Sequence, residues 1–272
     1  MTNVKDLAIT ELVDMVLFDP TTGDFWFALE ELQSWQLNQT ENTSDVTGRN
    51  GRLITRLKRN KAVTVSGTHG LVSGGLYEAQ TGSKFTSGNT KVMWTDYLTI
   101  SSNAATTKYV AVGTAGAEIV NLYIKDENGI TLGTELTQAS ALGDDATKFT
   151  YNPTTKALTF KSGAYADGTE IVVMYERQIA AVVLEDGAHT MSGKAVAYVN
   201  ALAEDTCHNV YRVQYYFPSL NFSGEFTNDL GGDQVTHNFS ATAESDSCLG
   251  NGEGAYFTYT VFGANAADVP VT

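Results

Sequence analysis

Short runs of apolar residues separated by polar turn clusters mark the beginning of the chain. The first run, residues 12–18, ends at Asp19–Asp24, a turn cluster that contains proline, threonine and glycine. A second apolar run, residues 25–29, follows directly. Because Gly, Pro, Asp and Thr clusters commonly separate neighbouring strands, the pattern predicts two strands connected through Asp19–Asp24.

Residues 92–177 show the clearest β pattern of the chain. Segments rich in β-branched and aromatic residues alternate there with turn signals such as Asn128-Gly129 and Asn152-Pro153. The segment Phe149–Phe160 predicts a hairpin with its turn near the middle. Further strands are predicted at residues 110–112, 119–124 and 170–175.

The last third of the chain continues in the same way. Strands separated by about 8–12 residues with turn signals between them are typical of a sandwich or a barrel. One earlier segment, residues 71–80, departs from this pattern and predicts a short helix that ends at Gly82. The predicted fold class is therefore mainly β, a sandwich or barrel with one short helix. The strands expected in the last third are 179–185, 194–202, 209–217, 234–242 and 255–262.

The composition agrees with a folded β protein and argues against several other classes. With 42% hydrophobic residues the chain can bury a core, so we do not expect extended disorder. Seventeen basic against 31 acidic residues give a net charge of −14, which disfavours a surface that grips phosphates. Apolar runs stay well below the roughly 18 residues of a membrane span. The first ten residues lack the basic and apolar parts of a signal peptide, so we expect neither feature.

The segment Asn38–Lys61 is polar, lacks a hydrophobic period and concentrates positive charge. Six of the 17 basic residues lie within residues 49–61 without any acidic residue, which leaves −20 for the rest of the chain. A long polar loop in a compact domain is unusual unless it has a function, and segregated opposite charge suits head-to-tail association of identical subunits. We therefore expect an arm that docks on an acidic neighbouring subunit. The candidate interface residues are Asp45, Arg49, Arg52, Arg56, Lys58, Arg59 and Lys61.

Two other interpretations of this basic segment stay open. The first is a solvated surface loop whose like charges repel one another. The second is an arm that binds nucleic acid, which is less favoured because the segment has no interleaved aromatic residues and belongs to an acidic protein.

Signatures of catalysis and metal binding are missing from the sequence. There is no Gly-x-Ser-x-Gly elbow and no phosphate-binding glycine loop ending in Lys-Ser/Thr. Cys207, His208, His237 and Cys248 do not have the spacing of a zinc site. We interpret both cysteines as small buried side chains, with a Cys207–Cys248 disulfide as the alternative. Paired acids such as Asp144-Asp145 are typical of solvated turns. We predict no enzyme activity, no metal and no cofactor.

Several stretches of the chain are similar to major tail tube proteins of tailed bacteriophages. The similarity rests on Asp45–Gly51 with the strand that follows, on Val63–Thr68, on the Phe149–Phe160 hairpin with Ala166–Ile171, and on Pro218–Phe262. This resemblance implies a β-sandwich or barrel core with a flanking helix at 71–80 and a long loop at 38–61. It also implies that six subunits close a ring by pairing their sheets, and that rings stack through the long loop into a hollow tube.

The resemblance further implies partners and a location. The tube would conduct double-stranded DNA without binding it specifically, and an acidic lumen would repel the phosphates. Implied protein partners are other copies of the subunit, the tape-measure protein, the tail terminator, baseplate or tip proteins and, in a contractile tail, a sheath. The expected location is the virion tail, assembled in the cytoplasm of the host bacterium.

The expected organisation has three segments. Residues 1–94 and 178–272 would form the two parts of the tube core, and residues 95–177 would be a β-rich insertion or elaboration. Two alternative functions remain at this point. One is another virion β-protein, such as a capsid decoration or fibre-base protein. The other is a carbohydrate-binding β-sandwich in which Trp26, Trp35 and Trp94 stack on sugars, although such residues more often belong to cores or interfaces.

Overall fold

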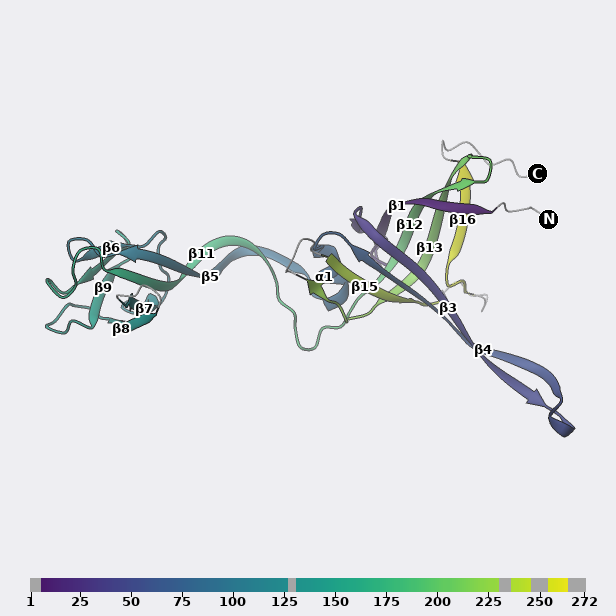
Figure 1. The fold of residues 1–272 in the computed structure, drawn as a ribbon, viewed down its shortest axis with the longest axis horizontal. Helices are drawn as coiled ribbons and strands as arrows, with labels where there is room; N and C mark the ends of the chain where they lie inside the picture. The colour runs from purple at the N-terminus through teal and green to yellow at the C-terminus, as the bar shows by residue number, and fades with distance from the viewer. Residues whose placement is uncertain (1–5, 127–130, 230–235, 246–253, 264–272) are drawn as a thin grey trace. The chain divides into compact units, whose positions relative to one another are not determined.

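The computed structural model describes residues 6–126, 131–229, 236–245 and 254–263, and the chain divides into two compact units. Unit 1 comprises Met1–Phe85 and Leu184–Thr272, and unit 2 is the continuous stretch Thr86–Val183. Unit 2 thus begins before residue 95 and ends after residue 177, the limits expected for an inserted segment. These described residues are mainly β with one short α-helix, as the sequence predicts (Figure 1).

Unit 1 is built on one large sheet of nine strands. The path of neighbouring strands is β2-β1-β12-β13-β15-β4-β3, with β14 beside β15 and β16 beside β13. The strands are β1 (Leu7–Phe18), β2 (Phe25–Leu29), β3 (Leu32–Thr47), β4 (Leu53–His69), β12 (Lys194–Asp205), β13 (Val210–Phe222), β14 (Asn228–Asp229), β15 (Thr236–Ala243) and β16 (Thr258–Gly263).

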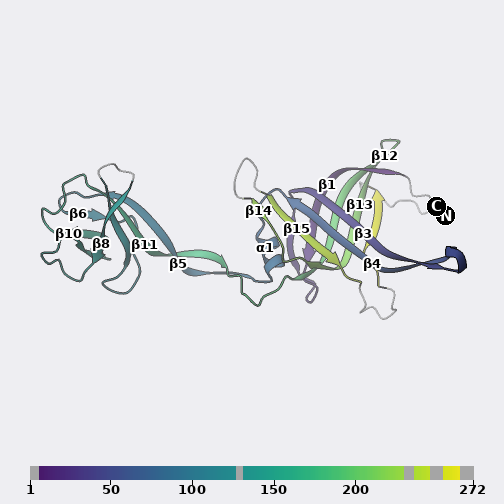
Figure 2. The same cartoon turned by 60° about the horizontal axis from the view of Figure 1, so that its bottom comes forward.

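A connection of only two residues forces this sheet to curl. The strands β2 and β3 stand at opposite ends of the strand path, yet Glu30 and Glu31 alone separate them in the chain. Two residues span only about 7 Å, so the two ends of the path must approach each other. The sheet therefore forms a curled half-barrel (Figure 2).

Strict alternation of buried and partly exposed residues fixes the inner face of the sheet. In β12 every second residue from Ala195 to Asp205 is buried, as the two-residue period of a strand requires. The small side chains of Ala195, Ala197, Ala201 and Ala203 leave room for larger core residues from other strands. The core of unit 1 includes Met15, Leu17, Leu29, Val63, Val65, Leu76, Phe217, Leu220, Phe222 and Phe239.

The helix α1 (Gly74–Thr81) contributes Leu76 and Ala79 to this core. Ser73 caps its first turn by accepting a hydrogen bond from the N–H of Leu76. Gly82 ends the helix in the left-handed conformation at φ 73°, which glycine adopts without strain. The predicted helix and its terminating glycine are confirmed, with the start of the helix three residues later than expected.

Unit 2 holds a seven-stranded sheet with the order β5-β11-β7-β8-β9-β10-β6. The β8–β9 pair is parallel, with Thr137 opposite Lys148. Its core includes Ile100, Leu122, Phe149, Leu158, Phe160, Ile171, Val173 and Tyr175. The strands are β5 (Phe85–Thr99), β6 (Ala104–Thr106), β7 (Ile119–Lys125), β8 (Leu132–Gln138), β9 (Lys148–Asn152), β10 (Ala157–Phe160) and β11 (Glu170–Leu184).

Two predictions for unit 2 have different outcomes. The hairpin Phe149–Phe160 is confirmed as β9 and β10. The predicted strand at residues 110–112 is wrong, because these residues belong to no strand. The N–H groups of Tyr109 and Ala111 donate to the hydroxyls of Tyr175 and Tyr151, at 3.0 and 2.9 Å, instead of entering a strand ladder.

Candidate functional site

The basic segment is a hairpin of two long strands rather than the irregular loop that the sequence predicts. The strands β3 and β4 pair from Leu32–His69 to Thr47–Leu53, whereas β15 accompanies β4 only from Val63 to His69. Beyond Val63 the hairpin is a two-stranded ribbon that extends away from the sheet (Figure 1). Because neither face of this ribbon is buried by its own subunit, no alternation of apolar and polar residues marked it as a pair of strands.

The turn at the end of the ribbon is short and well bonded. A single 3₁₀ turn, η1 (Arg49–Gly51), connects the strands. The N–H of Gly48 donates to the carbonyl of Arg52 at 2.8 Å, and the N–H of Gly51 donates to the carbonyl of Gly48 at 3.1 Å. Asn50 and Gly51 have left-handed φ values of 64° and 73°, which asparagine and glycine tolerate best.

A bulge lies where the ribbon leaves the sheet. Glu41 alone stands opposite Asn60 and Lys61, because the register shifts between the pairs Thr40–Ala62 and Asn42–Arg59. Asn60 has a φ of 53°, so the extra residue adopts the left-handed conformation. Bulges of this kind bend a strand and increase its twist. The bulge therefore sets the direction in which the ribbon projects.

Two of the six basic side chains form ion pairs within the hairpin. Arg56 makes a two-point contact with Asp45, with Nε–Oδ1 at 2.6 Å and Nη2–Oδ2 at 3.1 Å. The hydrogen bond from Arg56 lowers the pKa of Asp45, against a smaller opposing effect of desolvation. Lys58 Nζ lies 2.7 Å from Glu41 Oε1. These pairs hold Arg56 and Lys58 along the ribbon.

The other basic residues of the hairpin are placed differently. Arg49, Arg52 and Arg59 are exposed and form no ion pair with any residue that the structure describes. Lys61 Nζ lies 5.6 Å from the centre of the Tyr256 ring, and the Tyr256 hydroxyl donates to the Lys61 carbonyl. The unpaired positive charge of the ribbon therefore lies on Arg49 and Arg52 around the turn and on Arg59 in β4.

Apolar side chains also lie exposed near the turn. The exposed fractions of Val46, Leu53, Ile54 and Leu57 are 38%, 51%, 62% and 38%. Val46 belongs to β3, and the other three residues belong to β4. Cross-strand pairing gives the ribbon two different faces. Val46–Thr55 and Ser44–Leu57 share one face, and Asp45–Arg56 and Thr43–Lys58 share the other.

Each residue from Asn38 to Ala62 is exposed apart from the half-buried Gly48, and the core of unit 1 draws on none of them. A two-stranded ribbon is marginally stable in water by itself, and exposed apolar groups beside unpaired charges are typical of interaction surfaces. The structure therefore brings together six of the seven predicted interface residues on the projecting ribbon, and places Lys61 at its base.

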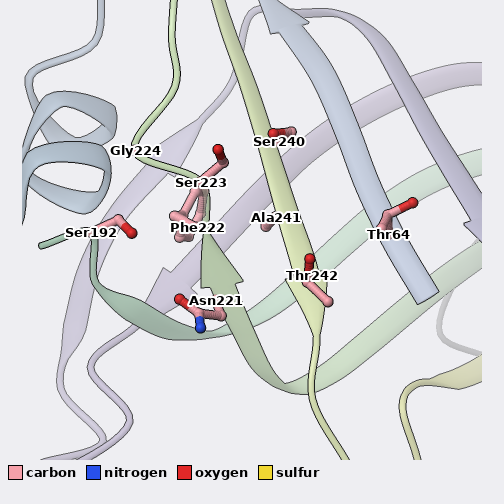
Figure 3. A pocket seen from close by; sticks show the side chains of 9 residues that line it. All are labelled: Thr64, Ser192, Asn221, Phe222, Ser223, Gly224, Ser240, Ala241 and Thr242. Carbon is pink, nitrogen blue, oxygen red and sulfur yellow. The ribbon is translucent and has the colours of Figure 1, made fainter. Parts of the chain in front are cut away.

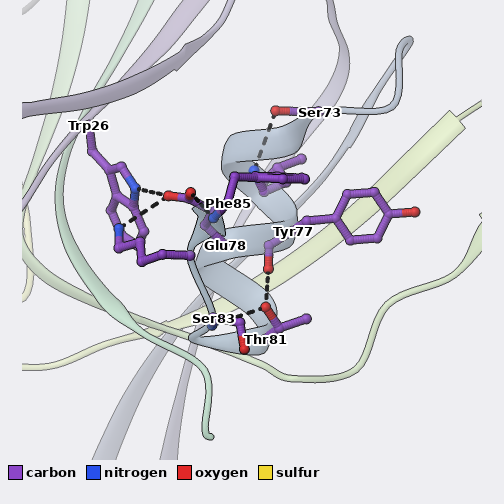
Figure 4. Close-up of polar contacts among 9 residues, drawn as sticks. Trp26, Ser73, Tyr77, Glu78, Thr81, Ser83 and Phe85 are labelled. Carbon is purple, nitrogen blue, oxygen red and sulfur yellow. Dashed lines mark hydrogen bonds and ion pairs between the residues drawn. The ribbon is translucent and has the colours of Figure 1, made fainter. Parts of the chain in front are cut away.

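At the opposite end of β4, the carboxylate of Glu78 fastens α1 to its surroundings (Figure 4). It accepts hydrogen bonds from Trp26 Nε1 and from the N–H of Phe85, both at 2.9 Å, and pairs with Lys84 at 3.1 Å. Partial burial raises the pKa of Glu78, but these three donors outweigh burial and the pKa is lowered. Glu78 is therefore a carboxylate with a structural role at neutral pH.

Two open clefts flank the segment that follows β13. One has a volume of about 370 Å³ and is lined by hydroxyl and amide side chains, among them Thr64, Asn221 and Ser240 (Figure 3). The other has a volume of about 400 Å³ and is lined by Gly224, Glu225, Phe226, Thr227, Asn238, Phe239 and Ser240. The described lining of neither cleft includes a histidine or a cysteine.

The residues considered for other chemistry have ordinary structural positions. Cys207 is exposed with a free thiol, so its prediction as a buried side chain is wrong, and Cys248 lies outside the described residues. Within the described ranges, no three histidine, cysteine or acidic side chains gather closely enough to hold a metal ion. The tryptophans are half-buried against aromatic neighbours: Trp26 on Phe27, Trp35 on Tyr215 and Trp94 on Tyr109.

The helical content bears on membrane insertion. In the part of the chain that the structure describes, no helix has both the length and the apolar character needed to cross a bilayer.

Comparison with known proteins identifies a family for this chain. The model of the YomU/Tube protein family matches residues 7–257, which covers both units. A search among curated proteins gives no match. Because the family match covers nearly all of the chain, including the projecting hairpin, the chain belongs to the YomU/Tube protein family and is a structural protein of the phage tail tube.

Proposed function

We propose that this subunit assembles into six-membered rings which stack through the β3–β4 hairpin into the tail tube. The exposed ribbon is the observation that carries the proposal. It projects about 30 Å beyond Val63, as ten residues of strand require. Its turn carries unpaired arginines and exposed apolar side chains, which a neighbouring subunit would cover.

Ring closure has a separate support in the edges of the sheet. Within the described residues, β3 pairs with β4 alone, so one side of a 16-residue strand has unpaired N–H and C=O groups. A long free edge is a template for pairing with a strand of another chain. We propose that neighbouring subunits of a ring use this edge to join their sheets.

The proposed tube conducts double-stranded DNA, and the charge of the subunit suits passage without binding. The net charge of −14 repels phosphates, and the positive charge gathers on the hairpin that the stacking contact would cover. The tape-measure protein would occupy the lumen before DNA enters. The tail terminator, the baseplate or tip proteins and, in a contractile tail, a sheath would be further partners of a tube assembled in the bacterial cytoplasm.

A shortened hairpin tests the role of the ribbon. Replacing Glu41–Lys61 with Asn-Gly joins Thr40 to Ala62 through a tight turn that suits a two-residue hairpin. Because the core of unit 1 includes no residue of this stretch, we expect the variant to fold. Negative-stain microscopy across a concentration series should show tubes with six-fold end views for the natural sequence, and only rings or single subunits for the variant. Tubes of normal length from the shortened variant would refute the stacking role.

A further inference from the structure

The two ends of unit 1 differ in charge and in apolar exposure. One end carries the hairpin turn with Arg49 and Arg52, while Arg59 lies on β4 opposite Asn42, closer to the sheet. The other end is where β4 finishes, since His69 pairs with His237 at the start of β15. Figures 1 and 2 show α1 and the start of β15 at that second end of the unit, away from the hairpin turn.

The second end carries acids without partners. Glu30 and Glu31 lie beside the end of β4, and the Glu31 carbonyl accepts a hydrogen bond from the N–H of Gly70. Glu225 lies on the segment that leads to β15. All three residues are exposed, and none forms an ion pair within the described ranges. Unpaired acids at this end therefore complement the unpaired Arg49 and Arg52 at the hairpin turn.

A cleft with two phenylalanines in its lining lies among these features. Phe239 lines the cleft of about 400 Å³ and is buried, while Phe226 stands at its margin with 37% of its surface exposed. Ring contacts hold Phe226 in place, with its centre 5.5 Å from that of Tyr77 and 5.8 Å from that of His237. The cleft thus has a fixed aromatic wall with Glu225 next to it.

We infer that this cleft, lined by residues 224–227 and 238–240, receives the hairpin turn of a second copy of the chain. The inference rests on the proposed stacking and names its receiving surface. Leu53 and Ile54, the most exposed apolar residues of the ribbon, cover Phe226, and an arginine of the turn reaches Glu225. A copy displaced along the direction of β4 brings the turn onto this end, so the contact repeats from ring to ring. Opposite charges fix the register of such a contact.

Cross-linking between two single-cysteine variants tests the contact directly. In a background with Cys207→Ser and Cys248→Ser, one sample carries Leu53→Cys and a second carries Thr227→Cys. The two are mixed under assembly conditions, treated with a short bis-maleimide and analysed by mass spectrometry. The matched control is Ala8→Cys. Ala8 is exposed and lines a different cleft of about 460 Å³, which lies at the same end of the sheet as the hairpin turn.

A dominant 53–227 cross-link with little 53–8 product is the expected result. Tubes that form without a 53–227 cross-link, or with 53–8 as the main product, would overturn the inferred contact and leave the tube function standing. A 53–227 cross-link in a sample without tubes would keep the contact and count against stacked rings. Absence of both tubes and cross-links would overturn both proposals.

A charge substitution gives a second readout. Glu225→Lys should shorten or abolish tubes while the protein stays folded, and Glu11→Lys, which makes the same charge change at an exposed position of β1, should not. If Glu225→Lys stacks as well as Glu11→Lys, Glu225 does not belong to the contact.

Discussion

Arg56 and Asp45 face each other across the β3–β4 hairpin and form a two-point ion pair, with Nε–Oδ1 at 2.6 Å and Nη2–Oδ2 at 3.1 Å. The pair separates the basic residues of the hairpin into two groups. Arg56 and Lys58 are neutralised by acids of the same hairpin, whereas Arg49, Arg52 and Arg59 keep their charge for another molecule. A basic segment in a sequence therefore overstates the charge that is available for binding.

The first prediction follows from this division. The triple variant Arg49→Ser, Arg52→Ser, Arg59→Ser should raise the protein concentration needed for tube assembly by roughly tenfold or more, as expected when three charged contacts of about 0.5 kcal/mol each are lost. Added salt should weaken assembly of the natural protein and affect the variant less, because salt screens exposed charges. Sedimentation and microscopy over a concentration series measure both effects.

The matched control for that variant is Asp45→Asn with Arg56→Gln, which removes one acid and one base and leaves the net charge unchanged. This double variant should assemble at nearly the natural concentration. If it impairs assembly as much as the triple variant, the paired residues contribute to the contact and the division proposed here is incorrect.

The second prediction concerns the packing of α1 against β2. Replacing glycine by alanine inside a helix usually stabilises it by about 1 kcal/mol. At Gly75, however, an added Cβ would lie 2.2 Å from Cγ of Phe27, and such overpacking costs about 1–3 kcal/mol. Gly75→Ala should therefore lower the free energy of unfolding, measured by urea titration. Gly74→Ala is the control, because its Cβ meets only the edge of the Phe85 ring at 3.1 Å and that exposed ring can move. Equal stability of the two variants would contradict the proposed packing.

The third prediction addresses the irregular segment of unit 2. The Tyr175 hydroxyl accepts from the N–H of Tyr109 and donates to Asp96 Oδ2 at 2.7 Å, and burial with the Asp96 contact raises its pKa. Tyr175→Phe leaves a backbone N–H without its acceptor, which costs about 1–3 kcal/mol. Hydrogen exchange should therefore become faster in residues 107–112. Tyr97→Phe, at a side chain that is 71% exposed, should leave this exchange unchanged. Unaltered protection in Tyr175→Phe would refute the anchoring role.

Signals that each lie within a few consecutive residues predicted much of this fold, because they do not depend on contacts between distant parts of the chain. The αL position of Gly82 and the turn within Phe149–Phe160 are such signals. The sequence could not show that Glu30 and Glu31 join opposite ends of one sheet path, since the curl depends on pairing between distant strands. Residues 110–112 have the composition of a strand, but the hydroxyl of Tyr151 in β9 binds the N–H of Ala111, and that of Tyr175 in β11 binds the N–H of the preceding Tyr109.

The candidate interface was predictable in its residues and not in its form. Charge concentration pointed to Arg49–Lys61 because it requires no knowledge of the fold. The two strands of the ribbon could not be predicted, because strands with both faces exposed do not require alternating apolar and polar residues. The receiving cleft was also hidden, since Glu225, Phe239 and the end of β4 meet only in the folded unit.

The final prediction concerns a buried histidine that links α1 to β15. His237 is fully buried, and its Nδ1 accepts a hydrogen bond from the N–H of Ser73 at 3.3 Å. The proton of the neutral ring therefore lies on Nε2, which donates to Gln80 Oε1 at 2.7 Å, while Gln80 Nε2 donates to the Asn238 carbonyl. Burial, and to a smaller extent the neighbouring His69, lower the pKa of His237 to about 4. Protonation of Nδ1 would break the bond that positions the cap of α1.

The sign of the pH dependence follows from this lowered pKa. Between the unfolded value of about 6.5 and the folded value of about 4, the unfolded chain binds a proton that the folded chain does not. The contribution of His237 to stability is therefore complete above pH 6.5 and falls by about 3 kcal/mol as the pH drops to 4. His237→Gln should reduce the slope of unfolding free energy against pH over this range, as measured by urea titrations at several pH values. His189→Gln, which changes an exposed histidine, should keep the natural slope, and an unchanged slope in His237→Gln would show that other groups cause the acid sensitivity.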